Sequence, residues 1–248
     1  MHRLVMAFLS IAAVAGVLHP QMASADKIGV ASAVKNEVQG IMGASPRALA
    51  AGSDVFSSER IRTGQESTAQ LLFLDETSLN VGPQSEITLD RFVYNPSRNT
   101  GNVVLSASRG AFRFVTGSQN PTNYTLRTPV ATIGVRGSIY DLFLRSVPAG
   151  VHEIAGLLIL VEGSLKITLR NGKVLLLNEL GKAVVFYGDG TYEVVTWDGS
   201  INSVVGNISF PLFGTTFGAD PRRFEIPDDQ GNLNDILKTG PFNNQTGG

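Results

Sequence analysis

Short runs of alternating apolar and polar residues, each ended by glycine, asparagine, aspartate or proline, fill the chain between residues 28 and 197. Alternation with a period of two predicts strands with one buried face, and the interrupting residues are those that turns favour. The sequence therefore predicts an all-β fold. Only two short helices are expected, at residues 45–51 and 232–238. The expected strands are residues 68–74, 79–81, 87–92, 111–115, 124–127, 130–135, 139–144, 153–161, 165–169, 174–177, 183–187 and 192–197.

A glycine-led repeat indicates how the strands are arranged. Its pattern is glycine, a small residue, an apolar residue, any residue and a second apolar residue. It matches residues 110–114, 163–167 and 190–194 fully, and residues 137–141 imperfectly because Asp141 stands in an apolar position. The four glycines are 27, 26 and 27 residues apart, although a further imperfect match at 199–203 is out of phase. This spacing predicts a β-solenoid or roll of short strands, in which each unit turns at a glycine.

The first 25 residues have the three-part layout of a secretory signal peptide. A basic start at residues 1–3 precedes an apolar run at residues 4–18, and residues 23–25 (Ala-Ser-Ala) form a small-x-small cleavage site. The apolar run is shorter than the ~20 residues that a spanning helix needs. We therefore expect cleavage before Asp26, and a mature chain that lies in the periplasm or outside the cell and does not span the membrane.

The charge balance argues against nucleic acid as a partner. The chain has 20 Lys and Arg against 21 Asp and Glu, and removal of residues 1–25 takes away only Arg3, which leaves 19 against 21, or a net charge of −2. Nucleic-acid binding favours strongly basic surfaces, so no nucleic-acid partner is expected. The chain also has no cysteine, so an exported protein of this kind is stabilised by its core and not by disulfides.

Residue types that carry catalysis or bind metals are scarce. Beyond residue 25, His152 is the only histidine, and the sequence has no Gly-x-Ser-x-Gly motif. Nucleophilic catalysis usually needs a histidine base, and zinc and iron sites draw on histidine and cysteine. We therefore predict that the protein is not an enzyme and has no catalytic, cofactor-binding or metal-binding residues. The acidic turns at Asp189 and at residues 228–229 lack EF-hand spacing, and we interpret them as solvated turns.

Several carboxylates leave an enzymatic alternative open, because an acid and a base from Asp or Glu suffice for glycoside hydrolysis. Asp75 lies in a predicted turn, where aspartate accepts backbone N–H groups. Its neighbour Glu76 would point to the opposite face of an extended strand. A polysaccharide-cleaving enzyme is thus a weaker alternative, and a structural or carbohydrate-binding surface protein is another. The candidate carboxylates are Glu66, Asp75, Glu76, Glu86 and Asp90.

The chain changes character at residue 198, where the strand pattern fades. Four phenylalanines in this segment are more than a plain linker would contain: Phe210, Phe213, Phe217 and Phe224. The segment therefore either packs on the β body or binds a partner. The final residues, 243–248, have the composition of a disordered end. The predicted organisation is a signal peptide at 1–25, a β domain at 26–147, its continuation at 148–197 and an irregular, partly disordered tail at 198–248.

Six segments in order carry a family resemblance: residues 59–64, 69–75, 78–83, 89–94, 109–114 and 128–138. Together they closely resemble the FecR domain family of bacterial envelope proteins, above all its simple secreted members. Ser138 replaces the threonine that usually follows Arg-Gly in the family and keeps its hydroxyl. Arg136 either ties backbone carbonyls together or contacts a partner. The positions that match the family motifs, which we interpret as structural, are Arg62, Thr63, Gly64, Asp75, Asp90, Gly110, Thr128, Pro129, Arg136 and Gly137.

The resemblance implies a periplasmic β domain that binds proteins. The best-known members are anti-sigma regulators in which a cytoplasmic segment and a membrane helix precede this domain, and the sequence shows neither feature. The resemblance therefore does not imply direct control of a sigma factor. We expect a non-catalytic binding or interaction module of the envelope, related to signalling, that recognises an envelope protein through a sheet edge or face. A glycan is the alternative partner.

Overall fold

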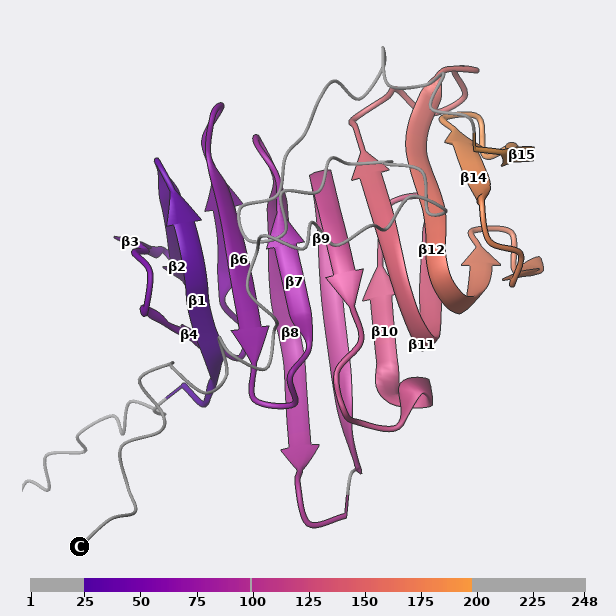
Figure 1. Cartoon of the computed structure of the whole chain (residues 1–248). Coiled ribbons are helices and arrows are strands. Elements are labelled where there is room, and N and C mark those ends of the chain that lie inside the picture. Colours follow the sequence, from indigo (N-terminus) through magenta and orange to yellow (C-terminus); the bar gives the residue numbers. More distant parts are fainter. Residues whose placement is uncertain (1–24, 99, 198–248) are drawn as a thin grey trace, which may run out of the picture.

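The computed structural model of the chain describes residues 25–98 and 100–197, and these residues form one extensive β-structure (Figure 1). The all-β prediction is confirmed, since the only helix in this part of the chain is the short 3-10 turn η1 (Pro121–Asn123). None of the described helical residues forms a segment long and apolar enough to cross a membrane. The strands are β1 (Lys27–Lys35), β2 (Val38–Met42), β3 (Ser45–Ala48), β4 (Asp54–Phe56), β5 (Arg60–Thr63), β6 (Thr68–Phe73), β7 (Ser78–Val81), β8 (Glu86–Asn95), β9 (Thr100–Val115), β10 (Tyr124–Arg127), β11 (Ala131–Leu144), β12 (Ile154–Leu169), β13 (Val174–Leu177), β14 (Lys182–Tyr187) and β15 (Tyr192–Thr196).

The fifteen strands are hydrogen-bonded into a single sheet whose pairing divides it into two layers. Layer A runs β4-β1-β6-β7, then the second half of β9, the second half of β11, the first half of β12, β14 and β15. Layer B runs β3-β2-β5-β8, then the first half of β9, β10, the first half of β11, the second half of β12 and β13. Strands before and after residue 148 thus belong to one sheet.

The three long strands β9, β11 and β12 connect the layers, and each contains a glycine with positive φ where its pairing changes. These are Gly110 (φ 106°), Gly137 (φ 60°) and Gly163 (φ 80°). Positive φ is strained for other residues, and a bulge at such a point bends a strand sharply. Gly163 also lies so close to the neighbouring strand that a Cβ atom would be 2.1 Å from the carbonyl oxygen of Gly137. The glycines therefore allow one sheet to bend into two layers.

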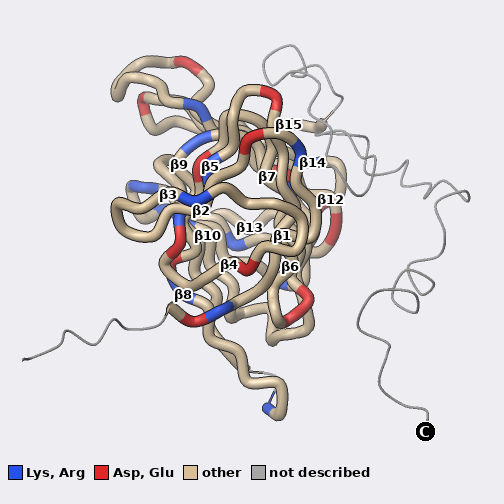
Figure 2. Tube along the Cα trace, turned by 90° about the vertical axis from the view of Figure 1, so that its left-hand side faces the viewer, with Lys and Arg blue, Asp and Glu red and all other residues tan. Residues whose placement is uncertain are grey.

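One large core fills the space between the layers. Its members come from both, for example Phe112, Leu142 and Leu158 from layer A and Leu105 and Ile167 from layer B. Alternation along each strand places these residues inward, as the period-two pattern predicts. Outside the core, basic and acidic residues are interspersed along the trace in the view of Figure 2, in keeping with the near-neutral net charge.

The repeat has a structural basis, but the predicted solenoid or roll is not confirmed, because the strands form one open sheet with free edges. Gly110, Gly137 and Gly163 lie on the neighbouring strands β9, β11 and β12, whereas Gly190 lies in the turn before β15. The predicted strands on either side of Gly137 and Gly163 are also continuous, not separate.

Asp141 departs from the repeat because β11 contains an irregularity just after its glycine. The register with β12 shifts between Arg136 and Tyr140. As a result Tyr140 and Leu142, and not Ile139 and Asp141, point into the core. Asp141 consequently faces the other side of the sheet, where it pairs with Arg113.

The predicted helix at residues 45–51 is wrong. Ser45–Ala48 is strand β3, which pairs with β2 through the register Met42↔Ser45 and Ile41↔Pro46. The two strands are joined by a two-residue turn with Gly43 at φ 58°, the backbone conformation that tight hairpins favour. The short segment lacks the length that an isolated helix needs. The helix predicted at 232–238 and the tail at 198–248 lie outside the described residues, as do residues 1–24 of the predicted signal peptide.

Candidate functional site

Four strands form the edges of the described sheet, and three of them carry features that discourage pairing with another chain. β3 contains Pro46, β4 is only three residues long and its Asp54 is paired with Lys27, and β15 contains the exposed charge of Glu193. Proline, shortness and charge are the usual protections of an edge strand. The fourth edge, β13, has the sequence Val-Leu-Leu-Leu and none of these features. We call β13 the open edge.

The backbone of the open edge has hydrogen-bonding groups that face away from the sheet. The hairpin that joins β12 to β13 is closed by the Leu169 N–H, which donates to the Lys173 carbonyl at 2.9 Å. In an antiparallel pair, hydrogen-bonded positions alternate with positions whose N–H and C=O groups point outward. The register Thr168↔Val174 and Lys166↔Leu176 makes Val174 and Leu176 the outward positions. These two residues therefore offer unpaired donors and acceptors to a partner strand.

The side chains of the open edge form an exposed apolar surface. Val174 is 52% exposed and Leu176 is 59% exposed, whereas Leu177 lies in the core. Leu180, just beyond the strand, is 62% exposed. Apolar side chains exposed beside unpaired backbone groups are the features by which a sheet edge binds an extended peptide.

Basic residues predominate next to this surface. Lys166, Arg170 and Lys173 are exposed on the β12–β13 hairpin, with Glu179 as the acidic residue at the end of β13. The Lys173 ammonium group also lies 5.1 Å from the ring centre of Tyr192, which orients it beside the edge. An acidic partner segment is therefore favoured over a basic one.

Residues 59–156 match the family model described as FecR protein. The matched part is less than half of the 248 residues of the chain. The match confirms the resemblance seen in the sequence. The matched region begins directly before β5 and ends within β12, so the open edge lies beyond the matched residues.

Two crystal structures of a candidate anti-sigma factor from Parabacteroides distasonis ATCC 8503, at 1.65 Å and 2.50 Å resolution, are also similar to the chain. Each has 12% sequence identity and is matched over 62% of this chain, which corresponds to 68% and 67% of the other chains. The TM-scores are 0.46 and 0.45. No curated protein matches the chain.

Several of the motif positions named above surround Ser85, which directly precedes β8. The Thr63 hydroxyl donates to the Gly82 carbonyl at 2.7 Å and accepts from the Ser85 N–H at 2.9 Å. The Gly64 carbonyl accepts from the Gln84 N–H at 2.9 Å. A Cβ atom on Gly110 would lie 2.0 Å from the Ser85 hydroxyl oxygen. These residues thus fix the turn between β7 and β8 against β5 and β9.

Asp75 is fully buried and joins the β6–β7 turn to the segment between β9 and β10. Its carboxylate accepts from the Tyr124 hydroxyl at 2.7 Å, the Gln119 side-chain amide at 2.8 Å and the Thr77 N–H at 3.0 Å. Burial, assisted by the adjacent Asp75 carboxylate, raises the pKa of Tyr124. Because three donors already hold it, this carboxylate is placed to stabilise the fold.

The remaining motif positions are spread along the domain. Arg62 forms an ion pair with Glu86 at 3.1 Å, and Asp90 accepts a hydrogen bond from Ser106. The Thr128 hydroxyl donates to the Ala131 carbonyl at 2.7 Å, which closes the turn that contains Pro129.

Arg136 is exposed, and its side chain has no hydrogen bond or ion pair with another described residue, while Gly137 lies at the bend of β11. Of the other candidate carboxylates, Glu66 and Glu76 are exposed.

His152 lies in the exposed loop before β12, not at the start of a strand. Its Nδ1 atom is 2.8 Å from Asp189 Oδ2 and its ring stacks on Tyr187 with 4.1 Å between centres. The Thr191 hydroxyl donates to Asp189 at 2.6 Å, and this bond, with help from His152, lowers the pKa of Asp189 to about 2. The hydroxyl therefore serves the carboxylate and is not activated by the histidine. Among the described residues, no three histidine or acidic side chains gather to hold a metal ion.

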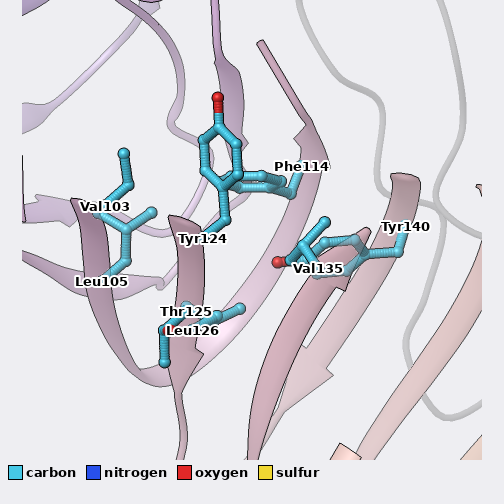
Figure 3. A pocket seen from close by; sticks show the side chains of 8 residues that line it. All are labelled: Val103, Leu105, Phe114, Tyr124, Thr125, Leu126, Val135 and Tyr140. Atoms are coloured by element: carbon cyan, nitrogen blue, oxygen red, sulfur yellow. The ribbon is translucent and has the colours of Figure 1, made fainter. Parts of the chain in front are cut away.

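Two buried tyrosines of the core permit a matched test of these hydrogen bonds. Both border a space in the core that is too small for a water molecule (Figure 3). The residues that line this space are Val103, Leu105, Phe114, Tyr124, Thr125, Leu126, Val135 and Tyr140. The Tyr124 hydroxyl binds Asp75, whereas the Tyr140 hydroxyl has no hydrogen-bond partner among the described residues.

We expect Tyr124→Phe to lower the free energy of unfolding by about 1–3 kcal/mol, because it leaves a buried carboxylate short of one donor. In contrast, Tyr140→Phe should leave stability unchanged or raise it, because it removes a buried hydroxyl that lacks a partner. Urea unfolding of both variants measures the two changes. Equal losses of stability would contradict the assigned hydrogen bonds.

Proposed function

We propose that the protein is a non-catalytic binding module of the bacterial envelope, which binds an extended segment of another envelope protein at the open edge. The observation that carries this proposal is the exposure of Val174 and Leu176 on a strand that offers unpaired backbone groups. A partner strand that pairs with β13 would satisfy these groups and bury both side chains.

The geometry of the open edge specifies the chemistry of its partner. A strand added beside β13 has side chains that alternate between the two faces of layer B. Those opposite Val174 and Leu176 meet exposed apolar side chains, and those between them lie beside the core-facing Leu175 and Leu177. The exposed Lys166 and Lys173 favour acidic residues in or beside this strand. We therefore propose a partner segment that is extended, apolar and flanked by acidic residues.

The cellular setting is part of the same proposal. The signal-peptide pattern of residues 1–25 supports export of the mature chain to the periplasm or beyond. The match of residues 59–156 to FecR supports a place in envelope signalling, because the resemblance implies a periplasmic domain of the kind that regulators of the envelope contain. The partner is then a receptor or membrane regulator whose extended segment reaches the periplasm.

Lysine substitutions at the open edge test the proposal. We expect Val174→Lys combined with Leu176→Lys to reduce recovery of the partner, by crosslinking and affinity capture from the envelope fraction, by at least about tenfold, because charged lysines on an edge oppose strand pairing. Both side chains are exposed, so stability should change by no more than about 0.5 kcal/mol per substitution. Ser45→Lys combined with Ala48→Lys on β3 is the matched control and should leave recovery unchanged.

Hydrogen exchange adds a structural readout. The amides of Val174 and Leu176 should exchange rapidly in the isolated protein and slowly in the captured complex, because pairing turns them into ladder hydrogen bonds. If capture survives the β13 substitutions, or if these amides keep exchanging rapidly in the complex, the open edge is not the binding site. Recovery of glycan alone would point to the carbohydrate-binding alternative.

A further inference from the structure

A row of buried residues, four of them polar, crosses the side of layer A that faces away from the core. Directly opposed residues on neighbouring strands point to the same side of a sheet. The pairs Gln70↔Asn80, Asn80↔Arg113, Arg113↔Asp141, Asp141↔Ile159 and Ile159↔Ala183 therefore form one continuous row. All six residues are at most 4% exposed. We call this set the outer row.

The strands of the outer row are buried on both sides, and in this respect layer A differs from layer B. On β12 the neighbours of Ile159, Leu158 and Leu160, belong to the main core, so Ile159 must face away from it. A second buried cluster shares two members with the outer row, and it consists of Ala111, Leu157, Ile159, Ala183, Val185 and Trp197. The corresponding positions of layer B are solvent-exposed, for example Thr132 and Lys166.

The buried state of this face requires a cover. Every member of the second cluster belongs to a strand of layer A, except Trp197, which follows β15 directly. Asn80 is 0% exposed, yet neither its oxygen nor its nitrogen has a hydrogen-bond partner in the part of the chain that the structure describes. A buried amide of this kind normally finds a partner. Both observations point to a segment that lies across the outer face of layer A and brings polar backbone groups.

We propose that residues 201–217 of this chain pack across the outer row and form that cover. Trp197, the last residue described, is 5% exposed and already part of the second cluster. Its N–H donates to the Gly181 carbonyl at 2.7 Å, which fixes the exit of the chain beside β14. The following segment therefore starts at one end of the face that it covers.

The length and chemistry of residues 201–217 suit this position. From β14 to β6 the face spans five strand spacings, or about 24 Å, and seventeen extended residues reach about 56 Å. The segment contains no charged residue, and its apolar residues are Ile201, Val204, Val205, Ile208, Phe210, Leu212, Phe213 and Phe217. An uncharged, apolar strip suits both the second cluster and the internally paired Arg113 and Asp141. At the far end Leu72 is 42% exposed, so the cover ends near β6.

Single engineered cysteines test the proposal cleanly, because the chain has no cysteine of its own. Ala183→Cys reports on the outer row, Thr132→Cys on the exposed face of layer B and Ala69→Cys on the core. In the full chain we expect a thiol reagent to label Ala183→Cys at least about 100-fold more slowly than Thr132→Cys. In a chain that ends at residue 198, labelling of Ala183→Cys should accelerate to within about tenfold of Thr132→Cys, while Ala69→Cys stays protected.

A second variant keeps the test decisive where truncation unfolds the protein and exposes Ala69→Cys as well. In the full chain, Phe210→Ser, Phe213→Ser and Phe217→Ser together should accelerate labelling of Ala183→Cys and leave Ala69→Cys protected. The proposal is overturned if Ala183→Cys reacts at the rate of Thr132→Cys in the full chain, or if it stays protected in both altered chains. It is also overturned if protection depends on residues 1–25 or on protein concentration, since a leader segment or a second copy would then be the cover.

Discussion

Gly163→Ala is expected to lower the free energy of unfolding by about 3 kcal/mol or more. Alanine at φ 80° adopts a strained conformation, and its Cβ would lie 2.1 Å from the Gly137 carbonyl oxygen on the neighbouring strand. That oxygen is backbone, so it cannot move aside without distorting the bend that joins the two layers. A shift of the urea unfolding midpoint to much lower concentration measures the loss.

Gly172→Ala is the matched control for this substitution. Gly172 has almost the same φ, 83°, but a Cβ atom there would meet nothing within 4 Å. Only the backbone strain then applies, and we expect a loss of about 1 kcal/mol. The difference between the two variants isolates the cost of the close approach between β11 and β12. If both alanines cost the same, the stacking of the bends is not what requires a glycine at residue 163.

The second large effect concerns the buried ion pair of Arg113 and Asp141. Arg113 Nε lies 2.6 Å from Asp141 Oδ1 and Nη2 lies 2.7 Å from Oδ2, with the side chains 2% and 0% exposed. Asp141→Asn leaves the guanidinium charge buried without its carboxylate, which should cost about 3–5 kcal/mol. Thermal or urea unfolding of the purified variant measures this loss.

Two comparisons separate the ion pair from other effects. Arg113→Met combined with Asp141→Leu should lose less than half as much stability as Asp141→Asn alone, because no unpaired charge is left in an apolar site. Lys27→Ala breaks the exposed pair with Asp54, whose side chains are 49% and 43% exposed, and should cost no more than about 1 kcal/mol. An Asp141→Asn loss as small as that of Lys27→Ala would contradict the assigned role.

Strand positions were predictable from the sequence because each strand of the described region buries one regular face. The ranges 124–127 and 174–177 agree with β10 and β13 at both ends, since turn residues bound them. The two short strands expected on either side of Gly163 proved to be one, because a glycine in a strand can mark a bend as well as a turn. Local sequence does not distinguish these outcomes, since the difference lies in the pairing partners.

The layered arrangement and the open edge could not be predicted, because both depend on which strands become neighbours. The run Val-Leu-Leu-Leu at 174–177 reads equally well as a central strand buried on both sides. Only the pairing shows that β13 has one partner among the described strands, which leaves the outward backbone groups of Val174 and Leu176 unpaired. The run of four apolar residues was the available signal, and an interior strand would have produced the same signal.

For the charged residues too, the sequence predicted the local position but not the partner in the fold. Asp75 was correctly placed in a turn from its neighbours. Its contact with Tyr124, far away in the sequence, required the fold. Asp141 was recognised as an irregularity of the repeat, but its reason lay in Arg113 on the neighbouring strand. Sequence patterns of single strands identify such positions as exceptions without identifying their partners.

Site-specific photocrosslinking at residue 176 in living cells tests the central claim, that the open edge binds an envelope protein, most directly. With the photoreactive residue in place of Leu176, we predict one dominant crosslinked protein whose linked peptide is extended, apolar and flanked by acidic residues. The same residue in place of Ser45, on the proline-protected edge β3, should give no such product. If both positions give the same products, or if position 176 gives none while the intact protein still captures a partner, binding does not occur at this edge.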